Sequence, residues 1–255
     1  MAWDPAQYLK FAGPRLRPAI DLLQRIDVES PRVVYDLGAG AGNVTRLLAA
    51  RWPQAKVIGV DSSAEMLAKA AAEHAGIEWQ HADLAAWRPQ YTPDIIYSNA
   101  ALHWLDGHDR LFPALLEALP AGGVLAVQIP RNFGARSHTL ITDTALNGPW
   151  RATLEPLLRP SPVEPPEFYY DLLAPRTASL DIWETEYLQV LEGANPVKEW
   201  TKGTWLLPLL AALGEPERSR FEADYAARVA AVYKPRPDGR TLFPFRRTFM
   251  IATRA

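Results

Sequence analysis

Residues 32–45 read R-V-V-Y-D-L-G-A-G-A-G-N-V-T, and this stretch decides the fold. A short apolar run suited to a buried parallel strand contains Asp36 near its end and is followed by alternating glycines from Gly38 to Gly42. Helical spacing begins at Asn43, so the glycines lie where a strand passes into a helix. Glycine permits the positive φ of a sharp turn and lets backbone N–H groups approach a ligand. The stretch therefore predicts a nucleotide-binding turn in a wound α/β sheet.

A second acidic residue supports a cofactor site. The run K-V-I-G-V-D at 56–61 is typical of another buried strand, and Asp61 at its end is placed to accept hydrogen bonds from both hydroxyls of a ribose. An NAD-binding fingerprint would have its third glycine at the position of Asn43, which disfavours an NAD-dependent oxidoreductase. Alternating glycines preceded by a strand-end acid instead resemble the turn of class I methyltransferases that bind S-adenosylmethionine.

Composition and charge exclude several classes of partner and site. A chain of 255 residues suffices for one elaborated α/β domain, and a net charge of −2 with scattered basic residues argues against a nucleic-acid partner. The absence of cysteine excludes disulfides and thiolate metal sites, and the five histidines lack the paired spacing of a metal site. No apolar stretch resembles a signal peptide or membrane span, so we expect a cytoplasmic protein.

Strands and helices alternate through the first half of the chain. Apolar residues at helical spacing predict a first helix over 15–26. The strands expected after it lie near 32–37, 55–60, 77–81, 94–98 and 123–129, with helices near 43–51, 63–75 and 108–119. Such alternation predicts a parallel sheet wound on both faces, with ligands bound beyond the carboxyl ends of the strands.

The second half of the chain does not continue this alternation of strands and helices. Dense prolines between 149 and 175 disfavour sheet and predict an ordered, extended insertion. Alternating apolar and polar residues predict a closing pair of antiparallel strands at 181–190 and 241–253. Helices are expected near 195–202, 204–213 and 215–233, partly over the strand ends as a lid on the ligand crevice.

Several segments, spread along nearly the whole chain, carry a family resemblance. They are W-D-P-A-Q-Y-L-K-F, the glycine turn, G-V-D-S-S-A-E-M-L, H-A-D-L-A-A-W, S-N-A-A-L-H-W-L, G-G-V-L-A-V-Q-I-P and the tail Y-K-P-R-P-D-G-R-T-L-F-P-F. On these segments the sequence resembles the trans-aconitate methyltransferases, which use S-adenosylmethionine to methylate a carboxylate of a small tricarboxylic acid. The resemblance implies a Rossmann-like class I methyltransferase fold, a seven-stranded and mostly parallel sheet with helices on both faces. One domain over 1–255 is implied, with a helical, proline-rich cap inserted near 131–180 and 195–233.

The resemblance also guides the choice of site residues. Those expected to bind the cofactor, S-adenosyl-L-methionine, are Asp36, Gly38, Gly40, Gly42, Asp61, Ser62, Met66, Asp83, Leu84, Asn99, Ala100 and Trp104. Those expected to contact the substrate are Tyr8, Arg17, His103, Arg131, Trp205 and Tyr233. Asp83 has a structural alternative as the N-cap of the turn that follows it. Further candidates to bind a carboxylate through two hydrogen bonds are Arg136, Arg246 and Arg247.

A carboxylate nucleophile needs little chemical help from the protein. Its ordinary pKa of about 4 leaves it ionised at neutral pH, so no general base is required. We therefore expect catalysis by positioning, in which nucleophile, methyl carbon and sulfur are held in line and away from water. His103 is either an orienting contact for the acid or a structural donor on the pocket wall.

Departures from the family pattern leave other methyl acceptors open. The family's G-T-G-L-R-P is G-T-W-L-L-P here, so Leu207 replaces an arginine and Trp205 adds bulk. A more apolar pocket would suit an oxygen or nitrogen of a less polar small molecule, with His103 as its base. A non-catalytic protein that binds S-adenosylmethionine is a further alternative. The expected partner is a small acid, with neither nucleic acid nor membrane, and the chain acts as a monomer or a homodimer.

Overall fold

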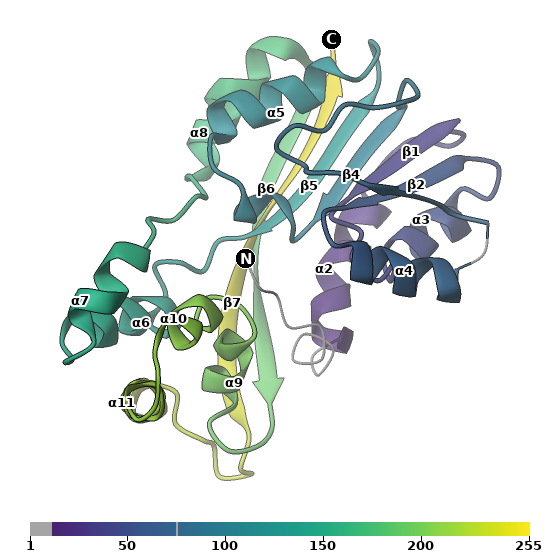
Figure 1. The fold of residues 1–255 in the computed structure, drawn as a ribbon. Coiled ribbons are helices and arrows are strands. Elements are labelled where there is room, and N and C mark those ends of the chain that lie inside the picture. The colour runs from purple at the N-terminus through teal and green to yellow at the C-terminus, as the bar shows by residue number, and fades with distance from the viewer. Residues whose placement is uncertain (1–11, 75) are drawn as a thin grey trace. The chain divides into compact units, whose positions relative to one another are not determined.

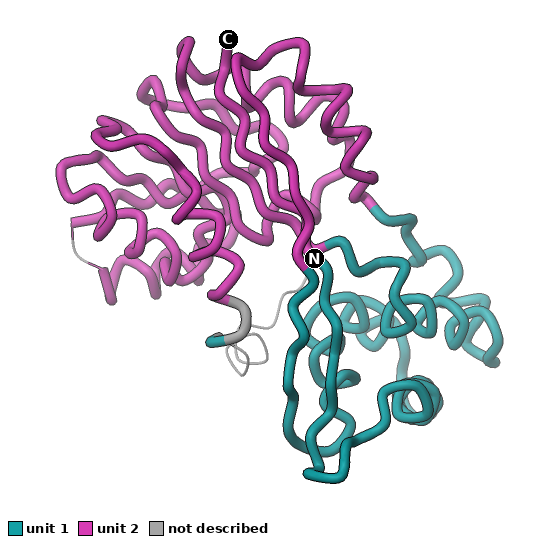
Figure 2. The backbone as a smooth tube through the Cα atoms, turned by 180° about the vertical axis from the view of Figure 1, so that it is seen from behind, with its two compact units in different colours: residues 1–15, 131–161, 186–246 teal, residues 16–130, 162–185, 247–255 magenta. Residues whose placement is uncertain are grey.

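The computed structural model describes residues 12–74 and 76–255, which form two compact units (Figure 2). Among these residues, unit 1 holds 12–15, 131–161 and 186–246, and unit 2 holds the remainder. Unit 1 takes in most of the two segments expected as insertions, whereas residues 162–185 group with unit 2. The glycine turn and most of the β-sheet therefore belong to a different unit from most of the second-half helices.

The sheet has seven strands in the order β3-β2-β1-β4-β5-β7-β6 (Figure 1). Their bounds are β1 Val33–Leu37, β2 Lys56–Asp61, β3 Glu78–His81, β4 Ile95–Asn99, β5 Val124–Pro130, β6 Thr177–Leu191 and β7 Thr241–Arg254. The first five strands are parallel, and β7 runs antiparallel to β5. Side-chain hydrogen bonds join Ser179 to Thr253 and Glu184 to Thr248, so β6 and β7 are also antiparallel. The predicted seven-stranded, mostly parallel sheet is confirmed.

Helices cover both faces of the sheet within unit 2. On one face lie α2 Ala12–Gln24, α3 Thr45–Arg51 and α4 Ala64–Glu73, and on the other lie α5 His108–Glu117 and α8 Pro166–Leu173 (Figure 1). The hydroxyl of Tyr97 on β4 donates to the backbone carbonyl of Ala19 on α2 at 2.8 Å, which fixes this helix on the buried strand. None of the helices in the described part of the chain is long and apolar enough to cross a membrane.

The proline-dense stretch is ordered, but it is more helical than the prediction of an extended insertion. Pro156 lies in the first turn of η2 Glu155–Leu157, Pro166 opens α8, and η3 Ala174–Arg176 also has a proline in its first turn. Proline suits these positions because its fixed φ matches a helix and the first-turn N–H has no partner within the helix. The same residues that disfavour sheet therefore begin short helices here.

Aromatic and aliphatic side chains form the core of unit 1. Its helices are α6 Arg136–Leu146, α7 Arg151–Leu154, α9 Pro196–Lys202, α10 Leu207–Ala212 and α11 Glu217–Val232. Phe221 on α11 is fully buried, and Trp150 packs against it edge to face with 5.3 Å between ring centres. The indole N–H of Trp150 donates to the carbonyl of Thr144 at 2.8 Å, so the buried ring leaves no unsatisfied donor. The helices α9, α10 and α11 confirm those expected near 195–202, 204–213 and 215–233.

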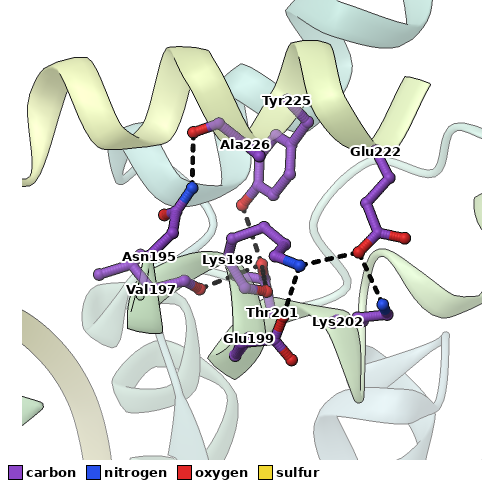
Figure 3. A network of polar contacts seen from close by, with 9 residues as sticks. All are labelled: Asn195, Val197, Lys198, Glu199, Thr201, Lys202, Glu222, Tyr225 and Ala226. Atoms are coloured by element: carbon purple, nitrogen blue, oxygen red, sulfur yellow. Dashed lines mark hydrogen bonds and ion pairs between the residues drawn. The ribbon is translucent and has the colours of Figure 1, made fainter. Parts of the chain in front are cut away.

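Polar contacts join α9 to α11 (Figure 3). Lys198 and Lys202 both place Nζ near Oε1 of Glu222, at 2.8 and 2.6 Å. The hydroxyl of Thr201 lies 2.9 Å from that of Tyr225. The Tyr225 hydroxyl also donates to the backbone carbonyl of Ser137 at 2.7 Å. Burial raises the pKa of Tyr225, which therefore stays a neutral donor at this junction of α9, α11 and α6.

Candidate functional site

The glycine turn lies at the carboxyl end of β1, as predicted. Gly38, Gly40 and Gly42 all have positive φ, at 83°, 56° and 81°, a conformation that other residues adopt only with strain. The N–H groups of Gly38 and Ala39 both donate to the carbonyl of Val60, at 2.8 and 3.0 Å. The turn is therefore tied to the end of β2, next to the second predicted acid.

Other protein atoms lie very close to the Cα atoms of two of the three glycines. A Cβ at Gly38 would lie 2.1 Å from the Cβ of Ala101, and one at Gly42 would lie 2.6 Å from the ring of Trp79. At Gly40 the nearest atom is the methyl carbon of Met66, at 3.8 Å from such a Cβ. Gly38 and Gly42 therefore allow close packing within the protein, whereas a Cβ at Gly40 would make only an ordinary contact with Met66. No local pattern along the chain marks the contacts from Ala101 and Trp79.

Asp61 is held in one orientation by backbone donors. Its Oδ2 accepts the N–H of Gly40 at 2.8 Å, and its Oδ1 accepts the N–H of Ser63 at 2.8 Å. A carboxylate oxygen has two lone pairs, so each oxygen can accept one more hydrogen bond. The arrangement fits a carboxylate that binds two neighbouring hydroxyls, with Ser62 exposed directly beside it.

Asp36 is buried within the sheet, with only 1% of its surface exposed. Its Oδ2 accepts the hydroxyl of Thr45 at 2.7 Å. Burial raises the pKa of Asp36 to about 7; the Thr45 hydrogen bond opposes this rise and the charge of Asp61 adds to it. Thr45 was not chosen from the sequence, although it follows the glycine turn directly in N-V-T.

Three other predicted cofactor residues, Met66, Asp83 and Leu84, differ in their surroundings. Met66 is buried in α4, with its methyl group facing Gly40. Leu84 lies near Gly38, with its Cδ1 3.9 Å from the position of an added Cβ. Asp83 is exposed, and its Oδ1 accepts the N–H of Ala85 at 3.0 Å, which is the hydrogen bond expected of its structural alternative. Its role at the adenine stays a prediction.

The chain leaves β4 through a strained turn. Ala100 has φ 54°, a left-handed conformation that is uncommon for alanine, and its N–H donates to the carbonyl of Gln128 at 2.9 Å. In the following 3-10 turn, η1 Leu102–Trp104, His103 is buried, and its ring lies 4.7 Å from that of Trp104, tilted by 40°. Strain in a non-glycine residue at a strand's carboxyl end is typical of a functional position.

The predicted substrate residues are divided between the two units. Arg17 in unit 2 has a side chain 73% exposed and lies 4.0 Å from Asp21, which is the geometry of a surface ion pair. Tyr8 lies outside the described residues. Arg131, Trp205 and Tyr233 belong to unit 1.

Within unit 1, Trp205 and Tyr233 have neighbours that the sequence did not reveal. Trp205 packs edge to face on Phe133 with 4.9 Å between ring centres, and His138 lies 6.3 Å away. Burial lowers the pKa of His138 to about 4, so this ring is neutral at pH 7. The hydroxyl of Tyr233 accepts the N–H of Ser137 at 3.2 Å and so caps the first turn of α6.

No group of three or more histidine, aspartate and glutamate side chains within the described ranges is arranged to hold a metal ion. The polar groups of unit 2 instead gather at the carboxyl ends of β1, β2 and β4, where Asp36, Asp61 and Asn99 lie. This edge is where wound α/β sheets bind their ligands.

Comparisons with known proteins agree with this geometry. A family model described as a methyltransferase domain matches residues 34–123. The trans-aconitate 2-methyltransferase of Azoarcus sp. (strain BH72) is 49% identical over 252 residues, with 99% of each chain covered. The trans-aconitate 2-methyltransferase of Rhodopseudomonas palustris (strain BisB18) is 44% identical, with 98% of each chain covered.

A solved structure supports the fold. The phosphoethanolamine N-methyltransferase 2 of Haemonchus contortus, in complex with S-adenosyl-L-methionine, matches with a TM-score of 0.57 at 14% identity. The match covers 94% of this chain and 53% of that one, so this chain spans about half the length of the nematode enzyme. At this identity the likeness concerns the fold alone.

Proposed function

This chain belongs to the trans-aconitate 2-methyltransferase family, and we propose that it transfers a methyl group from S-adenosyl-L-methionine to a carboxylate of trans-aconitate. The observation that carries the proposal is the near full-length identity of 49% to a relative of that name. The glycine turn with Asp36 and Asp61 supports the cofactor, since these residues converge at one edge of the sheet.

The residues of unit 2 fit this cofactor. When bound, S-adenosyl-L-methionine supplies a methyl group on a positively charged sulfur. Asp61 offers two oriented carboxylate oxygens to the ribose hydroxyls, and Gly40 is the least crowded of the three glycines of the turn. Asn99 and the strained Ala100 follow β4 at the same edge. We propose that the acid is bound already ionised, so that catalysis is by positioning and His103 orients the acid without acting as a base.

The test of this proposal is methyl transfer by the native protein. Incubation with labelled S-adenosyl-L-methionine and trans-aconitate should give a labelled monomethyl ester, identified by mass spectrometry. A panel of uncharged hydroxyl and amine compounds serves as the comparison. Methylation of that panel without any polyacid would overturn the proposal in favour of a less polar acceptor.

We expect Asp61→Ala to weaken binding of S-adenosyl-L-methionine by about 1–3 kcal/mol, the range for losing hydrogen bonds to a charged group. Isothermal titration calorimetry measures the change, and thermal unfolding checks that the sheet is intact. Asp109→Ala, which removes an exposed carboxylate from the first turn of α5, is the matched control and should bind like the native protein. An unchanged dissociation constant for Asp61→Ala would remove this residue from the ribose site.

Among the predicted substrate residues, we propose Arg131 as a ligand for a substrate carboxylate. We expect Arg131→Leu to lower kcat/KM for trans-aconitate at least tenfold, about 1.4 kcal/mol, with cofactor affinity unchanged. Arg220→Leu removes an exposed arginine from α11 of the same unit and should leave the kinetics unaltered. Equal kinetics for both variants would identify Arg131 as a surface charge.

We further propose that the enzyme is cytoplasmic and that its partners are small molecules. The scattered basic residues and the net charge of −2 support the exclusion of nucleic acid. Light scattering of the purified protein would decide between the expected monomer and homodimer.

A further inference from the structure

Gln128 on β5 is a buried amide with one hydrogen-bonding group unused. Its side chain is fully buried, and its Oε1 accepts from Nη1 of Arg247 at 3.2 Å. A guanidinium can only donate, so the partner atom must be the amide oxygen and Nε2 must point the other way. Nε2 has no hydrogen-bond partner among the described residues. Leaving a buried donor without a partner is energetically unfavourable, so a ligand that accepts from Nε2 would be stabilised there.

The strand register places this donor at the ligand edge of the sheet. Gln128 is paired with Asn99 on β4 and with Phe249 on β7, and Pro130 is paired with Arg247. Side chains alternate along a strand, so Gln128, Asn99 and Arg247 occupy the same face. Asn99, which is paired with Gln128, is partly exposed at this edge.

We infer that Gln128 recognises a carboxylate of the substrate that is not methylated, with Arg247 as the positioning residue that orients its amide. The inference rests on the proposed function. Nε2 donates to a carboxylate oxygen, and the guanidinium charge behind the amide favours an anion over a neutral acceptor. Arg247 is only 4% exposed, so its charge acts in a site with little solvent screening.

A carboxylate at this position could come from the substrate or from the methionine part of the cofactor. The residues that fit the cofactor lie on β1, on β2, in the turn between β1 and α3 and at the end of β4, whereas Gln128 lies on β5. Only β4 separates β1 from β5, and neighbouring strands are about 5 Å apart, so Gln128 is roughly 10 Å from β1. We therefore assign Gln128 to the substrate.

The first test changes the amide without changing its shape. In Gln128→Glu the new carboxylate pairs with Arg247 and repels the substrate, so kcat/KM for trans-aconitate should fall at least 100-fold, chiefly through KM. The dissociation constant of S-adenosylhomocysteine should stay within twofold, which also shows that the variant is folded. Gln80→Glu on β3 is the matched control, because its side chain accepts the indole N–H of Trp87 and a carboxylate still can. Weaker S-adenosylhomocysteine binding with KM unchanged would assign Gln128 to the cofactor and overturn the inference.

The second test varies the substrate and uses Gln128→Met, which removes the donor without adding charge. For the triacid, this variant should lose at least tenfold in kcat/KM. For diacids that each lack one carboxylate of trans-aconitate, at least one should be used equally well by the native protein and by the variant, since the recognised group is already missing. A uniform loss across all acids would overturn the inference.

Assays of the native protein distinguish failure of the proposed function from failure of the inference about Gln128. If it methylates no polyacid, the proposed function fails and this inference fails with it. If it methylates trans-aconitate and both Gln128 variants match it in KM and kcat, the inference alone is wrong.

Discussion

Replacing Gly38 with alanine should destabilise the protein by about 3 kcal/mol and lower its affinity for S-adenosyl-L-methionine at least 100-fold. Two effects combine at this position. A left-handed backbone costs an alanine about 1–2 kcal/mol, and overpacking a tight site costs about 1–3 kcal/mol more. The added Cβ would lie 2.1 Å from the Cβ of Ala101, an atom that cannot move without its backbone. We expect the turn to shift away from β4, and with it the N–H of Gly40 that orients Asp61.

Two further variants isolate the close contact. Gly122 has nearly the same φ, 81° against 83°, but nothing lies within 4 Å of an added Cβ, so Gly122→Ala carries the backbone strain alone. Ala101→Gly in the Gly38→Ala background removes the clashing atom and should restore much of the cofactor affinity. Urea unfolding and calorimetry measure both quantities. Equal losses at Gly38 and Gly122, with no rescue by Ala101→Gly, would show that the contact is unimportant.

Replacing Asp36 with asparagine should stabilise the cofactor-free protein at pH 8 by up to about 4 kcal/mol and leave its stability at pH 4 nearly unchanged. Burial raises the pKa of Asp36 from an ordinary 3.8 to about 7, so the folded state binds this proton more tightly than the unfolded state. The stability of the native protein therefore falls as pH rises from 3.8 to about 7 and carries the full cost above that range. Asparagine has no charge to bury, and its amide oxygen can still accept the hydroxyl of Thr45.

The measurement is urea unfolding of native and variant proteins at pH 4, 6 and 8 without cofactor. We also expect the variant to bind S-adenosyl-L-methionine more weakly, because this cofactor is cationic at its sulfur and amino group. Asp109→Asn, which removes the negative charge of an exposed carboxylate on α5, is the control for the loss of one charge. A stability difference of the same size at all three pH values would contradict the raised pKa of Asp36.

The sequence by itself determined the order of strands and helices and the cofactor turn. Period-two and helical spacings are local properties, so the strands at 33–37, 56–61 and 95–99 were predicted within one residue at each end. The positive φ of Gly38, Gly40 and Gly42 was likewise predictable, because a strand that turns directly into a helix needs such residues. The convergence of Asp36 and Asp61 followed from the rule that parallel strands share a carboxyl edge.

Only the tertiary structure decided which side chains meet across that edge. Ala101 reaches Gly38 from the turn after β4, and Thr45 and Asp36 are nine residues apart, so no local pattern marks either contact. The pairing of Gln128 with Arg247 spans 119 residues and depends on the register between β5 and an antiparallel β7. A shift of one residue would turn either side chain to the opposite face. The spacing of residues in the sequence determines which face of its strand a side chain occupies. Strand register and long-range packing determine which residues surround that side chain, and these neighbours set its pKa and its role in the site.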